Sequence, residues 1–113
     1  MAIEYTVHTY LASVITDVPI YIETPLQKPS QFIRIERTGG THDRYLKRAS
    51  IAIQAYAETL EDAITLIERV NDAMLDIITV DTVTKCDVTN VYPFNETNVK
   101  RYRYQSVCEL YYY

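Results

Sequence analysis

The order of hydrophobic and polar positions changes from a strand period to a helix period in the middle of the chain. Within residues 50–57, apolar side chains occupy alternate positions at Ile51, Ile53, Ala55 and Ala57. This spacing is typical of a strand with a buried face. From position 60 on, apolar residues recur every three or four positions, at Leu60, Ala63, Ile64, Ile67, Val70, Met74 and Ile77. We therefore predict a strand that leads into an amphipathic helix, whose apolar stripe must be covered by a sheet.

The residues before this helix are suited to starting it. Thr59 precedes the first apolar residue of the stripe, and a threonine hydroxyl at an N-cap accepts a hydrogen bond from a free amide of the first turn. Glu61 and Asp62 place negative charge near the positive end of the helix dipole. The central helix is therefore expected to begin directly after Thr59.

A second helix is predicted near the N-terminus, over residues 4–15. One side of it carries the apolar residues Val7, Tyr10, Leu11, Val14 and Ile15. The sequence Asp17-Val18-Pro19 is expected to end it, because the residue before a proline is disfavoured in the helical conformation. Residues 20–22 are expected to form a short extended segment, and two prolines within residues 23–30 indicate a loop.

A first hairpin is predicted between the two helices. Residues 32–37 are rich in β-favouring side chains and are expected to pair antiparallel with a strand over residues 44–57. Gly39 and Gly40 are the only glycines of the chain. We predict that they form the turn, which would then require a positive φ or a close approach of the backbone.

A second hairpin is predicted after the central helix, joining residues 85–92 to a last strand over residues 100–112. Alternation in the last strand places Tyr102, Tyr104, Ser106, Cys108 and Leu110 on one face and Arg101, Arg103, Gln105, Val107 and Glu109 on the other. One face of the sheet is therefore expected to be covered and the other to be exposed or to meet a partner.

Together, these elements predict an α+β fold with an antiparallel sheet of four to five strands. The long central helix and the N-terminal helix are expected to pack on one face of that sheet. With 113 residues and 48% hydrophobic content, residues 1–113 are expected to form a single domain. The apolar runs are far shorter than the roughly 18 residues that span a bilayer, so neither membrane insertion nor export is expected.

Charge is divided between the predicted elements. Arg69 is the only basic residue between Glu58 and Asp81, a stretch rich in carboxylates. The strands carry basic residues instead, at Arg34, Arg37, Arg44, Lys47, Arg48, Lys100, Arg101 and Arg103. In an assembly, the acidic helix of one copy could lie against the basic strands of the next, a head-to-tail arrangement that closes rings. Eleven tyrosines suit half-buried sheet positions and also surfaces that a partner covers.

The sequence offers little for catalysis. His42 stands beside Asp43, but such a pair in a turn is expected only to be solvated. Cys86 and Cys108 have no closely spaced partner and are expected to be buried free thiols. The two glycines are not followed by the Lys-Ser or Lys-Thr of a phosphate-binding loop, and no metal-ligand spacing occurs. We therefore predict neither an enzyme nor a bound cofactor.

A nucleic-acid partner is also not indicated. Residues 100–104, Lys-Arg-Tyr-Arg-Tyr, mix charges and rings as single-strand binders do. Strand alternation would place the arginines and the tyrosines on opposite faces, unlike a stacking platform. The formal net charge of −4 leaves only local patches for binding to a duplex. No sequence-specific nucleic-acid binding is predicted.

The order and spacing of several segments resemble a known family. These segments are Phe32-Ile33-Arg34-Ile35-Glu36-Arg37-Thr38-Gly39-Gly40, a loop with Asp43, Gln54-Ala55-Tyr56-Ala57-Glu58-Thr59, the acidic helix with Ala63, and the strand from Arg101-Tyr102 to Leu110. Together they resemble the tail terminator, or tail completion, proteins of long-tailed bacteriophages and prophages. The resemblance covers most of the chain between Phe32 and Leu110.

The resemblance implies a small structural protein, without enzymatic activity, that forms a ring, commonly a hexamer, on the head-proximal end of the tail tube. There it would stop tube polymerisation and join the tail to the head. Its partners would be copies of itself, the tail tube protein and a head-completion or connector protein, in a virion assembled in the cytoplasm of a host bacterium. The surface expected to meet other subunits or the tube comprises Arg34, Arg37, Thr38, Gly39, Gly40, Asp43, Arg44, Arg48, Arg101 and Arg103.

Two alternatives remain open from the sequence. The first is a head-completion or connector subunit of the phage neck, which would also be a small ring-forming protein. The second is an α+β module, unrelated to phages, that binds a small ligand in a pocket between sheet and helix.

Overall fold

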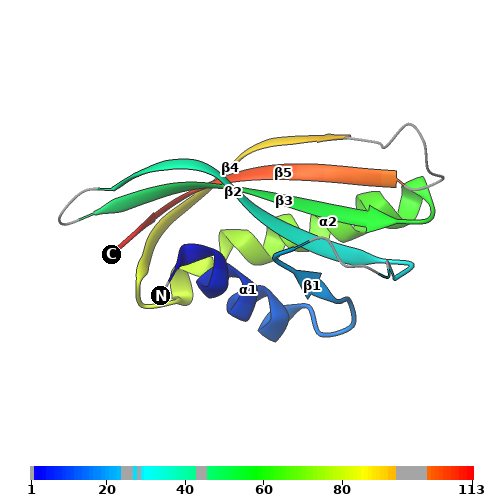
Figure 1. Cartoon of the computed structure of the whole chain (residues 1–113), viewed down its shortest axis with the longest axis horizontal. Coiled ribbons are helices and arrows are strands. Elements are labelled where there is room, and N and C mark those ends of the chain that lie inside the picture. Colours follow the sequence, from blue (N-terminus) through cyan, green and yellow to red (C-terminus); the bar gives the residue numbers. More distant parts are fainter. Residues whose placement is uncertain (1, 24–26, 28, 43–45, 94–101) are drawn as a thin grey trace.

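The chain folds into a layer of strands and a layer of helices in the computed structural model, which describes residues 2–23, 27, 29–42, 46–93 and 102–113. The elements are α1 (Ile3–Val14), β1 (Ile20–Tyr21), β2 (Phe32–His42), β3 (Lys47–Ala57), α2 (Leu60–Leu75), the 3-10 helix η1 (Ile77–Thr79), β4 (Val83–Pro93) and β5 (Tyr102–Tyr112). Within these residues the strands form one five-stranded sheet of order β1-β2-β3-β5-β4, and both α-helices lie on one of its faces (Figure 1). The predicted α+β class is confirmed.

The core lies between α2 and the central strands β3 and β5. α2 begins where it was predicted, because the Thr59 hydroxyl accepts a hydrogen bond of 3.2 Å from the backbone N–H of Asp62. Its buried side chains are Ala63, Leu66, Ile67, Val70, Ala73 and Met74. The predicted stripe was therefore slightly misplaced: Leu60 is 44% exposed, because it stands at the first position of the helix, beyond the part that packs on the sheet.

β3 is the centre of the sheet, and its burial exceeds the prediction. The expected face, with Ile51, Ile53 and Ala55, is buried under the helices. The opposite face is also buried at Ala52, Gln54 and Tyr56. Because β3 is flanked by β2 and β5 along its whole length, the side chains of those neighbours cover it even where no helix does.

The two glycines do not form the predicted turn. β2 continues through them to His42, and Gly40 pairs with Ala49 of β3. The irregularity is a bulge between Arg37 and Gly39, so the Thr-Gly-Gly sequence bends a strand and the chain reverses later. The expected backbone requirement is nevertheless met at Gly40, which has φ +148° and approaches β3 so closely that a Cβ would lie 2.3 Å from the Arg48 carbonyl oxygen.

The remaining strands follow the predicted order. β4 and β5 form the expected antiparallel hairpin, and β5 alternates as predicted, with Ser106, Cys108 and Leu110 buried. β1 differs from the expected antiparallel sheet, because it runs parallel to β2 and covers only Ile33 and Arg34 of that strand. A parallel neighbour arises here because α1 and the Pro19 segment carry the chain back to the side of the sheet from which β2 also starts.

α1 is joined to α2 by two polar contacts at its C-terminal half. The hydroxyl of Tyr10 donates a hydrogen bond of 2.6 Å to the Ala73 carbonyl. Beyond the helix end, Asp17 accepts two hydrogen bonds from Arg69 (2.6 and 3.1 Å). These contacts hold α1 against α2, while Val7 and Leu11 are buried against the rest of the core.

Candidate protein–protein interface

The face of the sheet that points away from the helices carries a network of hydrogen-bonded and stacked side chains; we call it the open face. One row of side chains crosses it with a contribution from each of four strands: Arg34, Gln54, Gln105 and Tyr92. Arg34 Nη1 donates to Gln54 Oε1 at 3.2 Å, and Gln54 Nε2 donates to Gln105 Oε1 at 2.9 Å. Gln105 Nε2 in turn contacts the Tyr92 hydroxyl at 2.5 Å. This row fixes the amide orientations across the sheet.

An aromatic row lies beside it. Phe32 and Tyr56 are stacked, with ring centroids 4.3 Å apart and planes at 9°, and Tyr21 of β1 meets Phe32 edge-on at 5.9 Å. The guanidinium of Arg103 lies 5.4 Å from the Tyr56 centroid, and its Nη1 donates a hydrogen bond of 2.8 Å to the Tyr56 hydroxyl. Tyr56 then donates to Gln54 at 3.2 Å, so the two rows form one network.

A charged corner occupies the same face near the outer end of β3. Ser50 donates a hydrogen bond of 2.6 Å to Glu109, and Arg48 lies 3.9 Å from the other oxygen of that carboxylate. Within this corner, Arg48 Nε and Glu109 Oε2 are shielded from solvent and have no hydrogen-bond partner among the described residues; the same holds for Arg34 Nε elsewhere on the face and for Glu4 Oε1 on the helix side.

The predicted interface residues do not form one patch. Arg34, Arg48 and Arg103 share the open face. Arg37 points to the other face, where it lies 3.9 Å from Glu4 of α1. Thr38 sits in the β2 bulge, and Gly39 and Gly40 follow it in the strand, whereas Asp43, Arg44 and Arg101 lie outside the described residues.

The charge contrast between helix and strands is weaker than the sequence indicates. Arg34 lies 3.3 Å from Glu36, Arg48 faces Glu109, and Arg37 faces Glu4. The strand arginines are therefore partly neutralised within the chain. Sequence reasoning missed the contacts of Arg37 and Arg48 because they depend on how α1 and β5 pack against β2 and β3, which the hydrophobic pattern does not determine.

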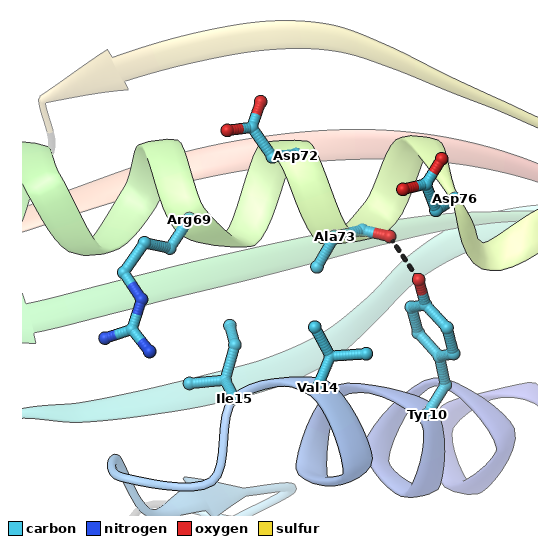
Figure 2. A pocket seen from close by; sticks show the side chains of 7 residues that line it. All are labelled: Tyr10, Val14, Ile15, Arg69, Asp72, Ala73 and Asp76. Carbon is cyan, nitrogen blue, oxygen red and sulfur yellow. Dashed lines mark hydrogen bonds between the residues drawn. The ribbon is translucent and has the colours of Figure 1, made fainter.

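Two surface grooves border α1, on either side of Tyr10. The first, about 370 Å³ in volume, lies between α1 and α2 (Figure 2) and is lined by Tyr10, Val14, Ile15, Arg69, Asp72, Ala73 and Asp76. The second, about 520 Å³, is lined by Thr6, Thr9, Tyr10, Ser13, Val80 and Thr82.

Tyr10, which both grooves share, keeps its proton. Burial, and then the Asp76 carboxylate, raise the pKa of Tyr10 above its ordinary value, so its hydroxyl stays protonated and keeps its hydrogen bond to the Ala73 carbonyl. Both grooves lie along a helix, not between helix and sheet as the ligand-binding alternative expects.

The two thiols meet in space although they are far apart in sequence. Cys86 pairs with Leu110, and Cys108 pairs with Val88, so the two cysteines are diagonal neighbours on β4 and β5. Their mutual hydrogen bond, together with burial of Cys108, raises the pKa of Cys108 and lowers that of Cys86. Both are free thiols, as predicted, but only Cys108 is fully buried.

Comparisons with known proteins do not assign this chain to a family. No protein-family model matches this chain, and no curated protein sequence is similar to it. Within the described ranges, no helix is long and apolar enough to cross a membrane, and no group of three or more His, Cys, Asp or Glu side chains is placed to hold a metal ion.

Proposed function

We propose that this chain is a structural protein of a bacteriophage or prophage virion. Copies of it assemble into a ring on the head-proximal end of the tail tube, end the polymerisation of the tube, and provide the surface to which the head attaches. Its partners are other copies of the chain, the tail tube protein and a head-completion or connector protein. The proposal assigns it no catalytic activity and no cofactor.

One observation carries this proposal beyond the sequence resemblance: three of the arginines expected at the interface lie on the open face, Arg48 near one end of β3 and Arg34 and Arg103 beside its other end. Hydrogen bonds and stacking hold that face in a fixed arrangement, so little side-chain entropy is lost when a partner covers it. Tyrosine and arginine are also the residues most enriched at protein interfaces.

The shape of the sheet supports the same function. The structure is elongated, with principal extents of 44 × 25 × 24 Å, and the β2–β3 hairpin extends past both helices (Figure 1). A projecting hairpin can reach a neighbouring subunit, which a ring-forming protein requires.

The direct test is tube assembly in the presence of the purified chain. Tail tube protein from the same genome is polymerised with and without it, and tube length and tube ends are measured by electron microscopy. We expect shorter tubes with a ring at one end. Tubes that grow to the same length and bind no ring would contradict the function.

A matched pair of variants locates the contact. Arg48→Glu is expected to reduce capping, and Arg69→Glu, which makes the same change in charge on α2, is expected to leave it unchanged, because Arg69 lies on the helix side of the sheet, where it pairs with Asp17 at 2.6 Å. Circular dichroism confirms that both variants fold. Equal capping by both would mean that apolar and tyrosine contacts, not these charges, bind the tube.

The alternative neck role makes a different prediction in the same experiment. A head-completion or connector subunit would bind DNA-filled heads and leave tube length unchanged. Incubating the labelled chain separately with purified heads and with purified tails, followed by sedimentation, distinguishes the two roles.

A further inference from the structure

Threonine bulges interrupt the edge strand β4 and also β2, which β1 covers only at Ile33 and Arg34. β2 has an extra residue at Thr38, and β4 has extra residues at Thr84 and Thr89. Each threonine hydroxyl donates to a carbonyl of the neighbouring strand, namely that of Ser50 (3.3 Å), Tyr111 (3.0 Å) and Val107 (3.0 Å) respectively. Bulges bend and twist a strand edge and so oppose the addition of another strand. Copies of the chain are therefore expected to meet through side-chain surfaces and not through sheet edges.

The larger groove beside α1 is the most apolar of these surfaces; we call it the α1 groove. It is lined by Thr6, Thr9, Tyr10, Ser13, Val80 and Thr82. Exposed apolar side chains continue it in adjoining segments: Ile78 is 53% exposed, and Tyr113, whose N–H donates to the Thr82 carbonyl at 3.0 Å, is 66% exposed. An apolar surface of this kind, rimmed by polar residues, is typical of a contact with another protein.

The surroundings of the α1 groove are acidic. Asp81 is exposed and stands between two of its lining residues, Val80 and Thr82. Asp76 lies on the other side of Tyr10 and is close enough to act on the charge state of that phenol. The groove therefore favours a partner that presents an apolar side chain next to positive charge.

The outer end of the β2–β3 hairpin has this character. Leu46 is 40% exposed and directly precedes Lys47 and Arg48. Lys47 pairs with Tyr112, at the end of the sheet that extends past the helices (Figure 1). The hairpin end borders the α1 groove of its own chain through Tyr112 and Tyr113, and its exposed Leu46 is accessible to a neighbouring copy.

We propose that Leu46 of one copy packs into the α1 groove of a second copy, with Lys47 beside Asp76 and Asp81. The contact joins two different surfaces, so it repeats head-to-tail and closes into a ring when the angle between copies permits. The inference rests on the self-association in the proposed function and does not require a tail tube.

The apolar part of the contact is tested with a matched pair of leucines. Leu46→Ser is compared with Leu60→Ser, because Leu60 is similarly exposed (44%) but begins α2 and lies outside the α1 groove. Light scattering across a concentration series measures association, and circular dichroism verifies folding. Burial of a half-exposed leucine predicts that Leu46→Ser raises the association Kd about tenfold, while Leu60→Ser changes it less than about twofold.

The charged part is tested by an exchange of charges. Lys47→Glu and Asp81→Lys are each expected to weaken association about tenfold. Combined in one chain, they restore it, because each interface again joins opposite charges. Lys47→Glu combined with Asp62→Lys is the control: it leaves the net charge unchanged, but Asp62 lies in the first turn of α2, so association stays weak.

The outcomes separate this interface from the function. A wild-type chain that stays monomeric at every concentration, or a Leu46→Ser variant that associates as the wild type does, overturns the proposed contact. So does a charge exchange that fails to restore association. Tube capping is measured in parallel: capping that survives these results preserves the proposed function without this interface, and association through the groove without capping preserves the interface without the function.

Discussion

Gly40 offers the sharpest test of the fold, because its neighbour Gly39 is a built-in control. Gly40 has φ +148°, and a Cβ there would lie 2.3 Å from the Arg48 carbonyl oxygen and 3.0 Å from Ala49 Cα. Both contacts are backbone atoms of β3, which cannot rotate away. At Gly39, a Cβ would meet nothing within 4 Å.

The magnitude follows from two costs that Gly40→Ala incurs together. A side chain at this φ costs about 1–3 kcal/mol of backbone strain. Displacing β3 to relieve the overlap costs about 1–3 kcal/mol more, as overpacking generally does. We therefore expect Gly40→Ala to lower the free energy of unfolding by about 2–6 kcal/mol. Gly39→Ala is expected to change it by less than about 1 kcal/mol, with any gain arising from the lower entropy of the unfolded chain.

Urea denaturation followed by circular dichroism measures both variants. The transition midpoint is expected to fall strongly for Gly40→Ala, with an unchanged slope, and to stay near the wild-type value for Gly39→Ala. Equal midpoints for the two variants would refute the close approach of β2 and β3 at this position. They would also favour the turn at the glycine pair that the sequence suggests.

Three further predictions concern the helices and the thiols. Thr59→Ala removes the N-cap of α2 and is expected to lower the free energy of unfolding by about 1 kcal/mol. Thr59→Ser keeps a capping hydroxyl and should preserve most of this stability. Urea denaturation measures both variants. The hydrogen bonds from Arg69 lower the pKa of Asp17 in the folded state, so their stabilisation is present above the unfolded pKa of about 4 and is lost as the pH falls through the lowered folded value. The stability gap between wild type and Asp17→Asn should therefore close on acidification, and a gap that persists at the lowest pH would contradict this. Cys86 should react with iodoacetamide before Cys108, as read by mass spectrometry, because it is less buried and the hydrogen bond lowers its pKa; faster labelling of Cys108 would be inconsistent with the structure.

Local pattern was sufficient to predict most of the elements. Helical spacing predicted both helices, and the N-cap at Thr59 predicted where α2 begins. Alternation in the last strand predicted which side chains of β5 face the core. The glycine pair misled, because Arg-Thr-Gly-Gly is compatible with both a turn and a bulge. Only the pairing of Gly40 with Ala49 distinguishes the two.

The candidate interface was harder to predict because it depends on contacts between distant strands. The placement of β5 between β3 and β4 brings Gln105 beside Gln54, and Arg103 onto Tyr56. Nothing in the local sequence of either strand indicates that neighbour. The Cys86–Cys108 contact was missed for the same reason.

The internal pairing of the arginines changes how self-association is expected to respond to salt. Arg34, Arg37 and Arg48 each face a carboxylate of their own chain. Exposed ion pairs contribute little energy, and an arginine that is already paired attracts the acidic helix of a second copy less strongly. The attraction inferred from an acidic helix and basic strands is therefore reduced to charges such as Lys47, for which the described residues provide no carboxylate partner. Apolar burial of Leu46 would then supply most of the association energy, and high salt, which screens exposed charges, should weaken assembly far less than Leu46→Ser does.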